Sequence, residues 1–91
     1  MPHRIQVRRS KGWRKPDNTV YVSRPSRFGN PFRIGNYTRE EAVMRYEQWI
    51  LSPGNAQLLR DARRLLAGKN LGCWCPLGQL CHADILLRLL N

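Results

Sequence analysis

The stretch Leu71-Gly72-Cys73-Trp74-Cys75 decides the fold that this sequence predicts. It is a short apolar run between breakers, which is typical of a buried β-strand. A loop at residues 76–80 follows it, and apolar side chains then recur at helical spacing over residues 82–90, which predicts a final helix. A strand this late in the chain must pair with strands from much earlier in the sequence.

Two early segments are candidate partners for that strand. Residues 4–8 (Arg-Ile-Gln-Val-Arg) alternate polar and apolar side chains, and residues 19–22 (Thr-Val-Tyr-Val) are β-branched or aromatic, so both predict strands. Residues 24–37 are rich in Pro, Gly and Asn, which predicts a loop. The aromatic residues within that loop should pack it against the protein.

Two helices are predicted between the second and third strands. Thr38-Arg39-Glu40-Glu41 matches a capping box, in which Thr38 caps the helix and Glu41 reaches back to it. Pro53-Gly54 ends this helix, Asn55 caps the next one, and Gly68 closes that one. The buried stripe of the second helix is expected to comprise Leu58, Leu59, Ala62, Leu65 and Leu66.

The expected order is therefore β-β-α-α-β-α within a single domain, residues 1–91. This order predicts the α/β (α+β) class, with a small mixed β-sheet of about three strands and about three packed helices. A chain of 91 residues has a thin core. A domain with such a core is often stabilised by an additional group, for example a metal ion, a ligand or a partner subunit.

The charge of the chain is strongly positive and unevenly distributed. Lys and Arg number 16 against 6 Asp and Glu, and the first 33 residues hold nine of the basic residues and one acidic residue. Such a field attracts phosphate-bearing partners. We therefore expect a nucleic acid or a nucleotide as partner, the alternative being a face that only keeps the protein in solution.

The sequence also bears on the compartment. It has no run of 18 apolar residues, so no membrane span is expected. The start Met-Pro-His-Arg-Ile lacks the apolar core of a signal peptide. Three cysteines are an odd number, which argues against a disulfide framework and favours a reducing cytoplasm.

The side chains best suited to metal binding or catalysis are clustered in the sequence at Cys73, Cys75, Cys81 and His82. Three thiolates and one imidazole would suit a tetrahedral Zn²⁺ ion. A regular strand through Cys73 and Cys75 would separate their Cβ atoms by roughly 6–7 Å, too far for one zinc ion, so the strand would have to bend. Cysteines can also be small buried apolar residues without chemistry.

An active site is the competing interpretation of the same residues. Cys81 and His82 stand where the final helix begins, and a helix N-terminus lowers a thiol pKa and binds phosphate. Cys81 would then be the nucleophile and His82 a base or a phosphate contact. Trp13 and the neighbouring Arg14 lie in a basic loop, where the ring of Trp13 could stack on a base. Trp74, in contrast, is expected in the core.

Two extended motifs resemble a known family. Residues 20–32 (VYVSRPSRFGNPF), followed by LGCWCP and CHAD, are similar to the bacterial and phage family called domain of unknown function 4326. The likeness runs from about Arg8 to Leu90. It implies the cytoplasm of a bacterium or of a phage-infected host cell, but no particular activity.

A fainter similarity, to domain of unknown function 488, implies that Arg24, Ser26 and Asn30 approach Cys81 and His82. Candidate ligand or phosphate contacts are therefore Trp13, Arg14, Arg24, Ser26, Arg27 and Asn30.

Three classes of function are compatible with the sequence. The leading hypothesis is a small basic protein that binds nucleic acid or a nucleotide and has a Cys/His site, with zinc as the candidate cofactor. The alternatives are an enzyme that acts on a nucleotide or modified base, and an interaction module that binds another protein through its basic face.

Overall fold

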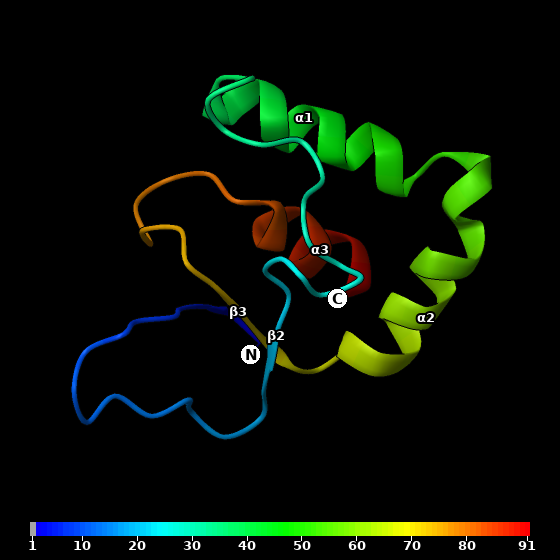
Figure 1. Ribbon diagram of the computed structural model, residues 1–91. Coiled ribbons are helices and arrows are strands. Elements are labelled where there is room, and N and C mark those ends of the chain that lie inside the picture. The colour runs from blue at the N-terminus through cyan, green and yellow to red at the C-terminus, as the bar shows by residue number, and fades with distance from the viewer. Residues whose placement is uncertain (1) are drawn as a thin grey trace.

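The computed structural model describes residues 2–91 and contains, within them, the expected order of elements (Figure 1). The elements are β1 (Arg4–Gln6), β2 (Thr19–Tyr21), α1 (Arg39–Ile50), the short 3₁₀ turn η1 (Pro53–Asn55), α2 (Ala56–Leu66), β3 (Asn70–Cys73) and α3 (His82–Leu90). The predicted order β-β-α-α-β-α and the α+β class are confirmed.

Strand β3 lies in the middle of the sheet, in the order β1-β3-β2, and runs parallel to both neighbours. The prediction of a mixed sheet was therefore wrong, because both pairs of neighbouring strands are parallel. The physical reason is the connection at residues 7–18, which is long enough to return the chain to the same end of the sheet instead of closing a hairpin. All three strands thus end on the same side, and their C-terminal ends point toward one region of the molecule.

The helices pack around α3, which covers the sheet (Figure 1). Helix α3 contacts β3 and β1, and α1 and α2 both pack against α3. The core between them contains fully buried apolar side chains from every layer, namely Val22, Tyr46, Ile50, Leu66, Leu71 and Leu86. Within residues 2–91, every helix is too short or too polar to cross a lipid bilayer.

The helices agree with the prediction from the sequence, with two exceptions. The capping box at Thr38 and Glu41 is confirmed, and Gly68 has the positive φ of +78° expected of a residue that closes a helix. Asn55 does not cap α2, because its side chain donates instead to the carbonyl of Trp49. Leu65 was expected in the buried stripe but is 42% exposed, because it lies at the edge of the apolar face of α2.

Candidate functional site

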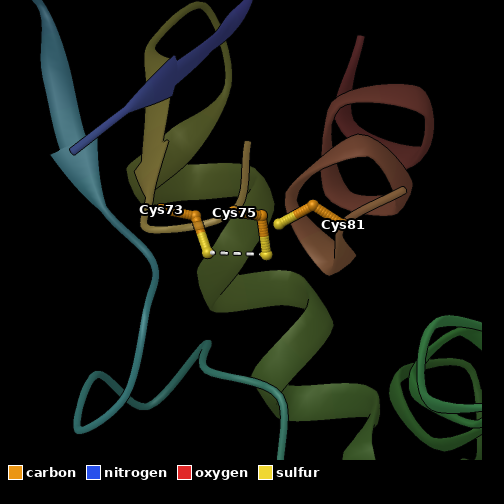
Figure 2. A group of neighbouring side chains, drawn as sticks. All are labelled: Cys73, Cys75 and Cys81. Atoms are coloured by element: carbon orange, nitrogen blue, oxygen red, sulfur yellow. Dashed lines mark hydrogen bonds between the residues drawn. The ribbon is translucent and has the colours of Figure 1, made fainter. Parts of the chain in front are cut away.

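The three cysteines meet at the C-terminal end of β3 (Figure 2). Cys73 is the last residue of β3, Cys75 follows in the loop, and Cys81 directly precedes α3. Their sulfur atoms all lie within 4.8 Å of one another, and those of Cys73 and Cys75 are 3.8 Å apart. The arrangement brings together side chains from a strand, a loop and the start of a helix.

A bend after β3 makes this approach possible. The strand was expected to continue to Cys75, but it ends at Cys73, so Trp74 and Cys75 lie outside the regular backbone. The bend removes the separation of roughly 6–7 Å that a regular strand would impose on the two Cβ atoms. It also turns Trp74 outward, so that its side chain is 45% exposed and the expectation that it belongs to the core was wrong.

Arg4 holds the loop that carries Cys75. Its guanidinium lies 2.7–3.3 Å from the backbone carbonyl oxygens of Cys75, Pro76, Leu77 and Gln79. Its Nε forms an ion pair of 3.1 Å with Asp84 of α3, whose other oxygen accepts from the backbone N–H of Cys81. Although Arg4 is a polar residue of an alternating strand, it is only 9% exposed, and its contacts connect β1, the loop and α3.

The three cysteines change one another's pKa, because their sulfur atoms lie close together. The pKa of Cys75 lies far below its ordinary value, first because Cys73 and then Cys81 interact with its sulfur, and further because the guanidinium of Arg39 is close. The pKa of Cys73 is raised, chiefly by the interaction of its sulfur with Cys75, and the pKa of Cys81 is raised by its interactions with Cys73 and Cys75. The guanidinium of Arg39 near Cys75 thus favours the thiolate form of this cysteine.

His82 lies beside the cluster and is buried. Its Nε2 is 2.7 Å from the carbonyl oxygen of Val22, which can only accept, so Nε2 carries the hydrogen and Nδ1 has the free lone pair. Nδ1 is 3.7 Å from the sulfur of Cys81. Burial lowers the pKa of His82, so the ring is neutral. Within residues 2–91, the donor atoms close enough to share one ion are the three sulfurs, and His82 lies outside that group.

The cysteines face a pocket of about 250 Å³, which we call the thiol pocket. Two cations, Arg24 and Arg39, and the buried Asn30 line it together with all three cysteines and His82. The amide of Asn30 is engaged with the protein, because it donates to the carbonyl of Ala42 and accepts from the N–H of Phe32. Asn30 therefore shapes the pocket wall, whereas the two guanidinium groups carry its positive charge.

A second pocket of about 440 Å³, which we call the aromatic pocket, adjoins the first. Ser23, Arg24 and Trp74 line both pockets. The remaining lining residues of the aromatic pocket are Val7, Arg8, Trp13, Lys15, Tyr21, Pro25 and Ser26.

The residues expected to contact a ligand divide between these surfaces. Arg24 and Asn30 lie in the thiol pocket with Cys81 and His82, whereas Ser26 lies in the aromatic pocket with Trp13. Arg27 and Arg14 line neither pocket, and Arg27 forms an ion pair of 2.6 Å with Asp61 of α2. Arg39, Lys15 and Trp74 line these pockets but were not predicted as ligand contacts.

The donor atoms fit a metal ion. Thiolates around a tetrahedral Zn²⁺ lie about 3.8 Å apart, given Zn–S bonds of about 2.3 Å. The separation of 3.8 Å between Cys73 and Cys75 matches this value, and the limit of 4.8 Å for the whole group requires only small side-chain rotations. The three cysteines could therefore hold a metal ion together.

Comparison with known proteins identifies the family but adds no activity. No curated protein and no solved structure matches the chain. The model of one family, described as Domain of unknown function (DUF4326), matches residues 5–91. This match begins within β1 and includes β2, every residue that lines the two pockets and all three cysteines. The chain therefore belongs to the family Domain of unknown function (DUF4326).

Proposed function

We propose that this protein binds a nucleic acid or a nucleotide in the thiol and aromatic pockets, beside a Zn²⁺ ion held by Cys73, Cys75 and Cys81. One observation carries the proposal: two arginines, Arg24 and Arg39, line the same pocket as the three sulfur atoms. Arginine side chains suit phosphate oxygens, and the net charge of +10 favours the approach of a polyanion.

The donor set favours zinc over harder cations. Thiolate ligands select soft metals, and oxygen-preferring ions such as Mg²⁺ would find no carboxylate in this group. Three thiolates leave one tetrahedral position, and because all three cysteines line the thiol pocket, a ligand in that pocket could fill it. Arg24 and Arg39 would offset the single excess negative charge of a zinc ion with three thiolates.

The metal is tested by elemental analysis of the purified protein. We expect about one zinc ion per chain, and Cys73→Ser, Cys75→Ser and Cys81→Ser should each lose most of it, because two thiolates hold zinc poorly. A chelator should lower the melting temperature of the wild-type protein, since metal binding stabilises only the folded state. Absence of a bound transition metal after purification under reducing, zinc-containing conditions would refute the zinc site.

The ligand is tested with a fluorescein-labelled oligonucleotide and fluorescence anisotropy. Arg24→Gln and Arg39→Gln should each weaken binding about tenfold, because each removes a guanidinium from the thiol pocket. Arg63→Gln on α2 is the matched control, since Arg63 is exposed and lines neither pocket. Equal losses in all three variants would mean that only net charge matters and would count against the pocket as binding site.

The enzyme alternative has weaker support. Cys81, its proposed nucleophile, is 1% exposed and has a raised pKa because of the neighbouring sulfurs and burial. Within residues 2–91, neither pocket is lined by an acidic side chain that could move a proton during hydrolysis. A binding function therefore agrees better with the geometry, and catalysis remains an untested prediction.

A further inference from the structure

We propose that the ligand is a single-stranded nucleic acid that spans both pockets, with a base stacked in the aromatic pocket and the adjoining phosphate at Arg24. This inference rests on the proposed function and names its ligand class. It follows from the adjacency of the two pockets, from the side chains that line the second one, and from the fixed position of Arg24 between them.

The two pockets are neighbours. Ser23, Arg24 and Trp74 line both of them, so a ligand that extends beyond one pocket would contact these side chains at the boundary with the other. The guanidinium of Arg24 is held there, because its Nη1 donates to the carbonyl oxygen of Asn30 at 2.5 Å. A phosphate that joins two nucleotides would meet this fixed cation at the boundary.

The aromatic pocket combines rings with cations. Tyr21 and Trp74 are 43% and 45% exposed, and Trp13 is partly exposed beside them. The ammonium of Lys15 lies 4.8 Å from the ring of Tyr21, and the guanidinium of Arg9, which does not itself line the pocket, lies 5.1 Å from the ring of Trp74. Exposed rings interleaved with cations are what an unpaired base and its phosphate require.

These features favour a single strand over a duplex and over a lone nucleotide. A duplex keeps its bases stacked on one another, so the protein rings would have no base face to contact. A nucleoside monophosphate carries a single phosphate, fewer than the cations that line the two pockets. Within residues 2–91, the two pockets together are lined by four cations and by no acidic side chain, which favours a ligand with more than one phosphate.

The first test is the dependence of affinity on ligand length. Thymidine monophosphate, the dinucleotide and oligothymidylates of four and eight residues compete with a labelled oligothymidylate at one fixed salt concentration. We expect affinity to rise at least tenfold from the mononucleotide to the tetranucleotide. We also expect a duplex of equal length to bind more weakly than the single strand.

The outcomes separate this inference from the proposed function. A mononucleotide that binds as tightly as the oligonucleotides, or a duplex that binds more tightly than the single strand, would overturn the inference and leave the proposed function standing. Failure of every nucleic acid and nucleotide to bind at low salt would overturn both.

The second test removes one ring from the aromatic pocket. Tyr21→Leu should weaken binding of the octanucleotide roughly tenfold, because it removes a stacking surface. Tyr37→Leu is a matched control, since the ring of Tyr37 also has a cation over it, Arg45 at 4.7 Å, but lines neither pocket. Both variants are first compared by thermal melting. If Tyr37→Leu weakens binding as much as Tyr21→Leu, the aromatic pocket is not the stacking site.

Discussion

Arg4 has a structural role that the sequence around it does not indicate. Its guanidinium donates hydrogen bonds to carbonyl oxygens of the loop at residues 75–79 and forms an ion pair with Asp84. One side chain therefore fixes both ends of the segment between Cys75 and Cys81. Backbone carbonyls brought so close together would otherwise repel one another. Arg4 therefore organises the sulfur cluster without touching any sulfur atom.

Replacing Arg4 by methionine tests this role. Arg4→Met should lower the free energy of unfolding by about 1–3 kcal/mol, because it leaves partly buried carbonyl oxygens and Asp84 without their charged donor. It should also weaken zinc binding at least tenfold, measured by competition with a chromogenic chelator. Arg14→Met is the control, because Arg14 is exposed and lines neither pocket. Unchanged zinc affinity in Arg4→Met would show that the loop is fixed by other contacts.

Elements position the remaining pocket residues. The loop between β2 and α1 carries Arg24 and Asn30, and Gly29 lies against the backbone of Arg24. A Cβ at position 29 would lie 2.9 Å from both the backbone nitrogen and the Cγ of Arg24. Glycine is therefore required there to let the loop fold back on itself.

Gly29→Ala should displace Arg24 and weaken oligonucleotide binding at least as much as Arg24→Gln does. The clash should cost about 1–3 kcal/mol of stability, because backbone and side chain must both move. Gly54→Ala in η1 is the matched control, since a Cβ there meets no atom within 4 Å. Binding and urea denaturation are measured on both variants, and equal behaviour would contradict the steric argument.

The capping box sets where α1 begins and therefore where Arg39 lies. Thr38→Ala should cost about 1 kcal/mol of stability at neutral pH. The hydrogen bonds from Thr38 lower the pKa of Glu41 below its ordinary value of 4.5. The contribution of Glu41 is thus complete above that value and is lost as the pH falls through the lowered pKa. The stability difference between wild type and Glu41→Gln should therefore shrink in acid, as followed by circular dichroism.

The sequence predicted the elements better than the site. Periodicity and the capping box located the helices because those signals are local, and the three cysteines are close together in the sequence. Trp74 was misplaced because alternation along a strand was extended past Cys73, where the backbone bends. Arg39 was missed because the face that a helical residue presents depends on how α1 packs, which is a long-range property.

The charge of the whole molecule determines how binding responds to salt. The cations Arg8, Lys15, Arg24 and Arg39 line the two pockets. Each contact with a single-stranded phosphate contributes about −0.7 to the slope of log affinity against log salt, so a total of about −3 is expected. Arg24→Gln should make this slope less steep by about 0.7, whereas Arg63→Gln should leave it unchanged. A slope near zero would exclude a polyanionic ligand.

The central place of β3 has a consequence for biosynthesis. Strands β1 and β2 touch the sheet only through β3, which follows them by some fifty residues or more. A nascent chain therefore cannot assemble any sheet until that strand has left the ribosome. The three cysteines, the first of which is the last residue of β3, therefore come together only after this strand is available to form the sheet.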